Sequence, residues 1–325
     1  MRNIQNIQVL EFEKPMAEIE QKLEALRHDS RASKTATGRK KIADLEGKHQ
    51  SLYNGLSAWE RVQMARHPNR PYMLDYIDLC FEGFVELHGD RHIGDDAAMP
   101  GGFAYLGDQR CVVIGHQKGR NTKENLQRNF GSANPEGYRK ACRLMKLAEK
   151  FRLPVISLID TPGAYPGIGA EERNIAEAIA FNLREMMLLK TPIVAVVIGE
   201  GGSGGALGIG VADEVMMLEN AYYSVISPEG CAAILWKDRK EGPKAAEALK
   251  ITAANLKKMG VVDQVVPEPI GGAHRNHAAA GDLLKSELQR SLKRLLRIPE
   301  KKMLDSRYEK FRQLGEFVEG LPPEG

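Results

Sequence analysis

The sequence predicts an α/β fold of layered helices and strands, and three observations predict it. Residues 155–159 and 193–198 are short runs that are apolar on both faces, as strands covered by helices on both sides require. A segment of helix length, residues 171–189, lies between the two runs. Each run is followed by a segment dense in glycine. Strands that alternate with helices in this way are typical of an α/β sheet.

The pattern of apolar residues predicts two helices within residues 15–56, separated by a polar break at residues 30–38. Ile19, Leu23 and Leu26 fall on one face of the first helix. These helices form either an arm that binds a partner or a hairpin packed on its own domain, and the pattern alone leaves both interpretations open.

Further elements follow in order, predicted from apolar periodicity and capping residues. They are a linker at 67–71, a helix at 72–84, a β-hairpin at 103–115 with its turn at Gly107-Asp108, a helix at 135–151, strands at 215–218 and 222–226, a helix that begins at Pro228, and an amphipathic helix at 282–296. We therefore expect three parts: a helical arm (1–70), a core (71–272) and a C-terminal helical segment (273–325).

Composition and charge exclude several classes of protein. The formal net charge of +3 is too small to indicate nucleic-acid binding. The longest apolar stretch, residues 192–199, is too short to cross a bilayer, and residues 1–20 lack the pattern of a signal peptide. The cysteines lie far apart at positions 80, 111, 142 and 231, without a metal-binding or disulfide spacing. We therefore expect no metal on this chain and a reducing, cytoplasmic location.

The segment Ile198-Gly-Glu-Gly-Gly-Ser-Gly-Gly-Ala-Leu-Gly-Ile-Gly210 is the chemical centre of the sequence, and it fits three motifs. The first is the dinucleotide fingerprint Gly-x-Gly-x-x-Gly, which starts here at Gly199, with Glu219 near the position of a ribose-binding acid. Only about ten residues separate this segment from the next strand, whereas the whole unit needs about thirty. This first interpretation is therefore disfavoured.

The second motif is Gly-x-Ser-x-Gly around Ser203, the nucleophile elbow of serine hydrolases. Asp213 or Asp263, followed by His274 or His277, would complete the chain order of a catalytic triad. A glycine-rich run produces this match easily. We favour the simpler interpretation that Ser203 caps the helix that follows.

The third interpretation is an oxyanion site, in which glycines at a helix N-terminus present free backbone N–H groups to a developing negative charge. The loop Asp160-Thr-Pro-Gly-Ala-Tyr-Pro-Gly-Ile-Gly169 also follows a buried strand. Because α/β sheets place ligands at the carboxyl ends of their strands, we expect the two glycine segments to lie side by side. Asp160 could act as a general base, but we favour a role in capping its turn.

Several short motifs occur in a specific order along nearly the whole chain. They are Gly115-His-Gln-Lys-Gly-Arg120, Asn129-Phe-Gly131, Pro135-Glu-Gly-Tyr-Arg-Lys140, Asp160-Thr-Pro-Gly-Ala-Tyr-Pro-Gly167, Gly169-Ala-Glu-Glu-Arg173, Gly199-Glu-Gly-Gly-Ser-Gly-Gly-Ala-Leu207 and Ser227-Pro-Glu-Gly-Cys231. In this order and spacing the sequence resembles the carboxyltransferase alpha subunits of multi-subunit acetyl-CoA carboxylases.

The resemblance implies a crotonase fold of repeated ββα units with helical extensions at both ends. It implies transfer of a carboxyl group from carboxybiotin to acetyl-CoA, which gives malonyl-CoA, the committed step of fatty acid synthesis. The implied partners are a carboxyltransferase beta subunit in an α2β2 heterotetramer, the biotin carboxyl carrier protein and biotin carboxylase. This chain would bind no cofactor of its own, zinc would lie on the beta subunit, and activity would require that subunit.

By the same resemblance, the biotin-side oxyanion hole falls on Gly204 and Gly205, with Ala206 adjoining. The second hole, for the acetyl thioester, would belong to the beta subunit. The biotin nitrogen can act as the base, so a side-chain base is unnecessary. The cleft for biotin and the acyl group is expected to be lined by Gly163, Ala164, Tyr165, Gly201, Gly202 and Ser203.

The basic stretch that contains Lys118, Arg120, Lys123 and Arg128 could meet CoA phosphates or an acidic face of a partner. We favour a solvated loop or intersubunit salt bridges, because charge runs are usually surface features. Two alternative functions remain open: a serine hydrolase or peptidase of the same fold that uses Ser203, and a non-catalytic scaffold subunit.

Overall fold

The computed structural model describes residues 8–29 and 35–315, and its centre is an eight-stranded mixed sheet. The strands lie in the order β1-β2-β3-β4-β5-β6-β8, and β7 pairs with the carboxyl end of β5. The first three strands pair antiparallel and the later pairs are parallel. The bounds are β1 (Glu82–Glu86), β2 (Gly101–Leu106), β3 (Gln109–Gly115), β4 (Val155–Thr161), β5 (Ile193–Gly202), β6 (Glu214–Leu218), β7 (Tyr222–Ser224) and β8 (Gln264–Val266).

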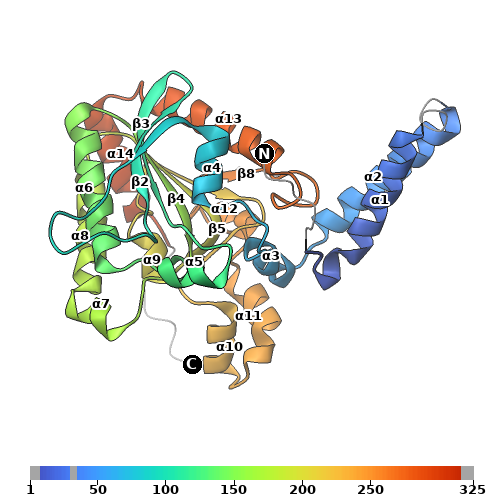
Figure 1. Cartoon of the computed structure of the whole chain (residues 1–325), viewed down its shortest axis with the longest axis horizontal. Helices are drawn as coiled ribbons and strands as arrows, with labels where there is room; N and C mark the ends of the chain where they lie inside the picture. The colour runs from blue at the N-terminus through green and yellow to red at the C-terminus, as the bar shows by residue number, and fades with distance from the viewer. Residues whose placement is uncertain (1–7, 30–34, 316–325) are drawn as a thin grey trace, which may run out of the picture.

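Helices cover both faces of this sheet, with α6 and α8 packed together on one side and α4 and α13 on the other (Figure 1). Every residue of β4 and β5 is buried, which explains why these strands are apolar on both faces. The predicted α/β class is therefore confirmed. The helices of the core are α3 (Ala58–Ala65), α4 (Met73–Cys80), α5 (Thr122–Gln127), α6 (Pro135–Phe151), α7 (Ile168–Glu172), α8 (Ile175–Leu188), α9 (Ser203–Leu207), α10 (Pro228–Leu235), α11 (Gly242–Leu249), α12 (Ala253–Lys258), α13 (His277–Leu295) and α14 (Glu300–Arg312), and the short 3-10 turns are η3 (Asn129–Gly131) and η4 (Arg239–Glu241).

Some elements differ from the sequence prediction for identifiable reasons. The helix expected at 72–84 ends at Cys80, because the following residues form β1 and complete the sheet beside β2. The helix expected at 171–189 is broken into α7 and α8 by Asn174, whose φ is +64°. Residues 199–202 continue strand β5 and are not a loop. The sequence analysis did not predict helices α3, α5, α11, α12 and α14.

The two N-terminal helices, α1 (Lys14–His28) and α2 (Ala36–Asn54), form a hairpin that projects from the core (Figure 1). The short turn η1 (Glu11–Glu13) precedes them. A small apolar cluster of Met16, Tyr53 and Met64 joins the base of the hairpin to the core. The hairpin therefore packs on its own domain only at its base and projects as an arm beyond it, and whether the arm binds a partner stays a prediction. The break expected at residues 30–38 falls partly outside the described residues.

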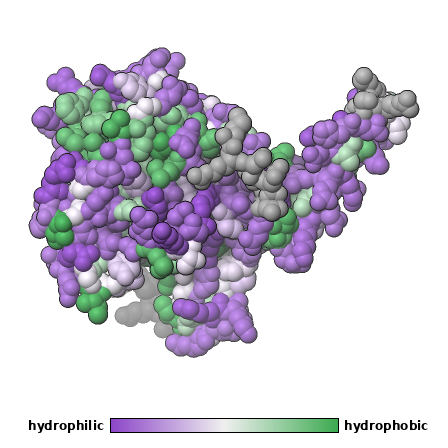
Figure 2. Space-filling model, in the orientation of Figure 1, coloured by the Kyte–Doolittle hydropathy of each residue, from purple (hydrophilic) through white to green (hydrophobic). Residues whose placement is uncertain are grey.

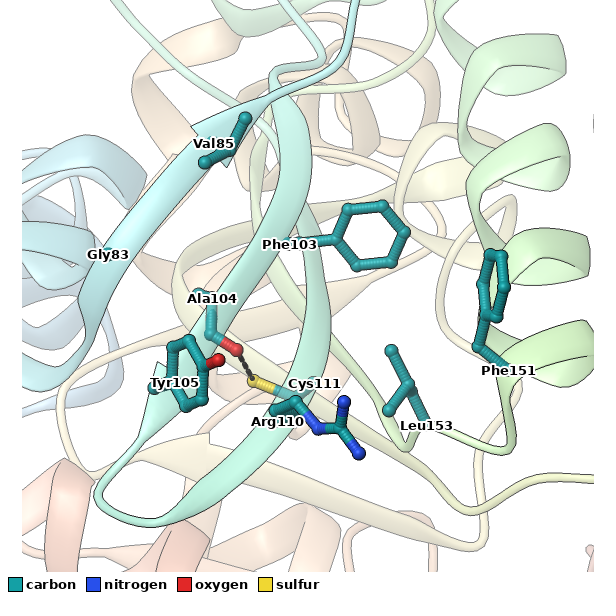
Figure 3. Close-up of a pocket in the computed structure, with 9 residues that line it drawn as sticks. All are labelled: Gly83, Val85, Phe103, Ala104, Tyr105, Arg110, Cys111, Phe151 and Leu153. Carbon is teal, nitrogen blue, oxygen red and sulfur yellow. Dashed lines mark hydrogen bonds between the residues drawn. The ribbon is translucent and has the colours of Figure 1, made fainter.

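An apolar surface lies over β2, β3 and the carboxyl end of α6 (Figure 2). This surface contains an open pocket of about 500 Å³, lined by side chains that include Val85, Phe103, Tyr105 and Phe151 (Figure 3). It adjoins the amino ends of β3 and β4, at the opposite end of the sheet from the glycine segments. Among the described residues, no helix is both long enough and apolar enough to span a membrane.

Candidate active site

The carboxyl ends of β4 and β5 bring the two glycine segments into contact. A Cβ atom on Gly202 would collide with the backbone oxygen of Pro162, and one on Gly205 would lie 2.5 Å from the backbone nitrogen of Ala164. Only glycine permits so close an approach of two backbones. The expectation that the two segments lie side by side is therefore confirmed.

The turn from β5 into α9 places Ser203 in the left-handed region, with a φ of +49°. The N-cap of α9 is Gly202, and no side chain caps the helix. Ser203 is therefore not the cap that we expected, because it already lies one residue inside the helix. The first backbone N–H groups of a helix have no acceptor within it. A Cβ atom on Gly204 would meet only Ile179 Cδ1, at 3.7 Å, so space is open beside the α-carbon of this residue.

The dinucleotide interpretation does not fit this geometry. Its glycines would have to form a loop after a strand, but Gly199 and Gly201 lie within β5. The helix α9 has five residues, which is too short for the phosphate-binding helix of such a unit. Glu219 accepts hydrogen bonds from Tyr53 Oη and from the Glu268 backbone N–H, near the base of the arm.

The residues proposed to complete a triad with Ser203 are engaged elsewhere. Asp213 accepts a hydrogen bond from the Ile193 N–H, the first of β5, and Asp263 accepts one from the Val215 N–H near the start of β6, at the opposite strand ends from Ser203. His274 bonds to a glutamate of the arm, and His277 bonds to a backbone oxygen of the 67–71 linker. The structure therefore does not assemble the predicted triad.

One buried cluster has the residue types of a metal site: Glu13, His67 and His274. His67 Nδ1 accepts a hydrogen bond from the Asn69 backbone N–H at 3.1 Å, and His67 Nε2 lies 2.8 Å from the Gln8 carbonyl oxygen. This pattern requires the proton on Nε2, which then cannot bind a metal. Burial, followed by repulsion from His274, lowers the pKa of His67 to about 4, so the ring is neutral. The cluster is a hydrogen-bonded junction between arm and core.

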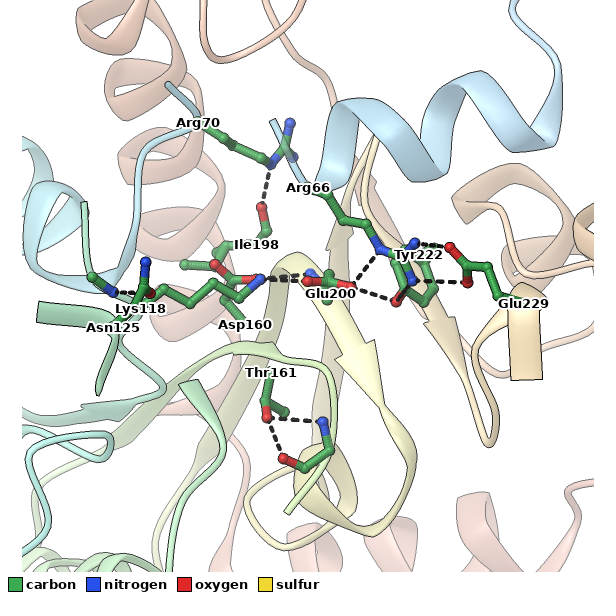
Figure 4. A network of polar contacts seen from close by, with 12 residues as sticks. Arg66, Arg70, Lys118, Asn125, Asp160, Thr161, Ile198, Glu200, Tyr222 and Glu229 are labelled. Atoms are coloured by element: carbon green, nitrogen blue, oxygen red, sulfur yellow. Dashed lines mark hydrogen bonds and ion pairs between the residues drawn. The ribbon is translucent and has the colours of Figure 1, made fainter. Parts of the chain in front are cut away.

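Beside the glycine segments lies a buried network of charged side chains (Figure 4). Lys118 Nζ lies 2.7 Å from Asp160 Oδ1 and 2.7 Å from Glu200 Oε1. The Glu200 backbone N–H also donates to Asp160 Oδ1, at 2.9 Å. These contacts join the segment after β3 to the ends of β4 and β5. Gly199 is needed here, because a Cβ atom would lie 2.5 Å from Asp160 Oδ1.

The other carboxylate oxygen of Glu200 extends this network. It accepts hydrogen bonds from Arg66 Nε at 2.7 Å and from Tyr222 Oη at 2.6 Å, and Arg66 also pairs with Glu229. Burial alone would raise the pKa of Glu200, but the charges of Lys118 and Arg66 outweigh burial and lower it to about 2. Burial would likewise lower the pKa of Lys118, yet its two carboxylate partners hold that pKa above its usual range. Both groups are therefore ionised at neutral pH.

Two of the predicted basic residues, Lys118 and Arg120, make specific contacts within the fold. The Lys118 side chain is 12% exposed and lies in the network, so it does not belong to a solvated loop. Arg120 stacks on the Tyr72 ring at 3.8 Å, pairs with Asp75, and donates to two backbone oxygens of the linker. Neither side chain shows an observed contact with a phosphate or a partner, and those roles stay predictions.

The remaining predicted site residues lie on the loop after β4, in β5 and in α9. The Gly163 backbone N–H donates to Thr161 Oγ1 at 3.1 Å, so Thr161 caps this turn and Asp160 does not. The Tyr165 backbone N–H donates to the Ala133 carbonyl at 3.0 Å, and its side chain is 38% exposed. Ala206 is buried within α9. Gly201 lies in β5, where a Cβ atom would lie 2.9 Å from the Tyr223 ring.

Sequence reasoning missed Glu200, Arg66 and Tyr222. A signal for the first was present, since Glu200 is a charged residue in an otherwise apolar run and a buried charge requires a partner. No local signal identifies Arg66, which lies 134 positions before Glu200.

The strand order and the helical layers define a protein of the crotonase fold. Among solved structures, the chain resembles transcarboxylase 12S with methylmalonyl-coenzyme A and methylmalonic acid bound (TM-score 0.56, 18% identity), covering 77% of this chain and 43% of that one. It also resembles a Pseudomonas malonate decarboxylase hetero-tetramer in complex with coenzyme A (TM-score 0.55, 16% identity), covering 66% of this chain and 86% of that one. These likenesses concern the fold alone, and the predicted crotonase fold is confirmed.

Closer relatives give the family. The family model described as acetyl co-enzyme A carboxylase carboxyltransferase-like matches residues 9–315. The acetyl-coenzyme A carboxylase carboxyl transferase subunit alpha of Geobacter metallireducens is 54% identical over 314 residues, which are 95% of this chain and 98% of the relative. The subunit of the same name from Methylococcus capsulatus is 54% identical over 318 residues, 97% and 99% of the two chains. The chain belongs to the acetyl-coenzyme A carboxylase carboxyltransferase alpha-subunit family.

Proposed function

We propose that this chain is the alpha half of an acetyl-CoA carboxyltransferase, which transfers a carboxyl group from carboxybiotin to acetyl-CoA to form malonyl-CoA. This reaction is the committed step of fatty acid synthesis. The observation that carries the proposal is the family match over residues 9–315. The contact between the two glycine segments supports it, because it presents backbone donors at the strand ends.

The chemistry requires stabilisation of negative charge on oxygen twice. Loss of the carboxyl group leaves charge on the ureido oxygen of biotin, and proton removal from the acetyl methyl leaves an enolate on the thioester. We assign the first charge to the backbone N–H groups of Gly204 and Gly205, with Ala206 adjoining. Open space beside Gly204 supports this assignment. Removing one such donor typically costs about 2.7–4 kcal/mol of barrier.

The cleft around this hole would be lined by the loop after β4 and by the end of β5. Gly163, Ala164 and Tyr165 lie on the first of these, and Gly201, Gly202 and Ser203 belong to the second. The contact between Gly205 and Ala164 supports a shared cleft, since it holds both backbones together. Lys118 and Arg120 lie beside this cleft, and from this position we propose them for contact with CoA or with a partner subunit.

The partners follow from the two-enolate chemistry and from the name subunit alpha that the relatives carry. The second oxyanion hole would come from a beta subunit, which would carry the zinc, in an α2β2 heterotetramer. Carboxybiotin would arrive on the biotin carboxyl carrier protein after its formation by biotin carboxylase. The four free cysteines agree with a reducing cytoplasm as the location.

The test compares the isolated chain with the chain mixed with its beta partner. The isolated chain should form no malonyl-CoA from carboxybiotin and acetyl-CoA, and the mixture should form it. Light scattering of the mixture should give a particle of about twice the mass of one alpha–beta pair. Full activity of the chain alone would exclude the divided site. Ester hydrolysis with covalent labelling of Ser203 by a serine-directed probe would instead support a hydrolase.

A further inference from the structure

The segment Asn129-Phe130-Gly131 forms a left-handed turn, with φ angles of +44°, +56° and +83°. Two hydrogen bonds close it, from the Gly131 N–H to the Arg128 carbonyl at 2.8 Å and from the Ser132 N–H to the Asn129 carbonyl at 2.9 Å. Non-glycine residues rarely adopt this backbone, and two in succession are rarer. Asparagine tolerates it through its short polar side chain, but phenylalanine has no such compensation.

Neighbouring elements impose this conformation on the turn. Arg128 Nη1 donates to the Ala97 carbonyl at 2.7 Å and anchors one side. On the other side Gly131 packs closely, since a Cβ atom there would lie 2.8 Å from the Lys118 side chain and 3.1 Å from the Asp160 carbonyl oxygen. The turn is therefore held against the ends of β3 and β4, where the charged network and the glycine segments lie. In Figure 1, α5, which leads into the turn, and α9 lie at this same edge of the sheet.

The strained turn exposes the aromatic ring of Phe130 to solvent. The side chain of Phe130 is 54% exposed, so it adds little to the apolar core. Strained conformations that folding does not reward tend to occur where function requires them. The loop of Tyr165, which is also exposed, is joined to the segment just after the turn by the Tyr165–Ala133 hydrogen bond. Two exposed aromatic residues thus lie on adjoining loops, and the loop of Tyr165 contacts Gly205 through Ala164.

We propose that Phe130 is a substrate-contacting residue that forms an aromatic wall on the biotin side of the cleft. This inference rests on the proposed function. Backbone N–H groups can bind the ureido oxygen, but they do not fix the plane of the ring system. An apolar aromatic surface supplies that orientation, as in most small-molecule sites.

The position of the turn favours biotin as the group beside Phe130. Gly131 lies against Lys118 and Asp160 at the ends of β3 and β4, where we assign the backbone donors to the ureido oxygen. Lys118 and Arg120 are paired with carboxylates, whereas Lys123 is exposed and Arg128 donates to the Ala97 carbonyl. Positive charge that could meet CoA phosphates therefore also lies near the turn, and the test measures the KM for malonyl-CoA separately.

The test uses the assembled complex and runs the transfer in reverse, from malonyl-CoA to free biotin. Phe130→Asn should raise the KM for biotin about fivefold and leave the KM for malonyl-CoA unchanged. Because asparagine tolerates a left-handed backbone, the thermal midpoint should stay equal or rise. Phe130→Tyr keeps the ring and should retain the KM. Phe151→Asn is the matched control, since Phe151 is 56% exposed but lies at the opposite end of the sheet.

Each outcome decides for or against the aromatic wall. An unchanged KM for biotin in Phe130→Asn would overturn it, as would a rise in the KM for malonyl-CoA alone. Loss of complex assembly in Phe130→Asn would make Phe130 a subunit contact and would also overturn it. An inactive unsubstituted complex would reject the proposed function itself, whereas a fully active Phe130→Asn complex would reject only the role of Phe130.

Discussion

Replacing Lys118 by methionine removes the cation that joins Asp160 to Glu200. The two carboxylates would then remain buried without this partner, and breaking a buried ion pair in this way typically costs about 3–5 kcal/mol. Glu200 keeps Arg66 and Tyr222 as partners, so we expect the lower end of that range, about 3 kcal/mol. For a chain of 325 residues the unfolding entropy is about 0.7 kcal/mol/K, so such a loss lowers the thermal midpoint by about 4 °C.

Thermal unfolding of the purified chain, followed by circular dichroism at neutral pH, measures this effect. Lys123→Met is the matched control, because Lys123 is exposed on α5 and its replacement should change stability by no more than about 0.5 kcal/mol. The double variant Lys118→Met/Glu200→Gln also removes the Glu200 carboxylate that the loss of Lys118 leaves without its partner. It should therefore lose less stability than the two single changes added together. If Lys118→Met has the same thermal midpoint as Lys123→Met, the network does not stabilise the strand ends and the reasoning is refuted.

Two further predictions concern the glycine turn and the base of the arm. Gly205→Ala should strongly lower the thermal midpoint, because its Cβ atom would lie 2.5 Å from the Ala164 nitrogen. Gly204→Ala should keep the fold, since its Cβ atom would meet only Ile179 Cδ1 at 3.7 Å, and its methyl group should hinder carboxyl transfer by occupying space beside the proposed hole. Equal midpoints for the two variants would contradict this. His67 has a pKa lowered to about 4 by burial and by His274, so its contribution to stability is complete above the unfolded pKa of about 6.5 and is lost as the pH falls towards 4. Urea midpoints measured from pH 4 to 7 should therefore fall less steeply with acid in His67→Gln, and parallel profiles would count against this assignment.

The central layers of the fold could be predicted because buried strands and helix faces consist of apolar residues, which form a recognisable pattern along the sequence. Strands β4 and β5 appear in the sequence as continuous apolar runs, and the hairpin β2–β3 appears as two apolar runs around Gly107-Asp108. The C-terminal helix was predicted from Leu284, Leu288, Leu292 and Leu295, and all four are buried in α13. These features depend on residues that are neighbours in the chain.

The errors arose where long-range contacts decide the local structure. Residues 82–86 become β1 because the edge of β2 offers hydrogen-bond partners, which no local helical period reveals. Asn174 breaks the predicted helix into α7 and α8 because its backbone is left-handed. Asparagine tolerates this conformation, but its presence in a sequence does not predict it. At the site, the motifs predicted which backbones meet, but the network joins residues 118, 160 and 200 through contacts that spacing alone cannot show.

The charged network and the glycine segments depend on each other. A glycine-rich backbone has no side chains with which to hold its position, yet backbone donors stabilise an oxyanion only when they are held in place. A displacement of about 1 Å in such a site can cost about 100-fold in rate. Asp160 directly precedes one glycine segment and Glu200 lies within the other, and the Glu200 N–H donates to Asp160 Oδ1. Ionised side chains beside the turn therefore supply the rigidity that its glycines lack, and a loss of Lys118 should reduce the rate of transfer more than it weakens substrate binding.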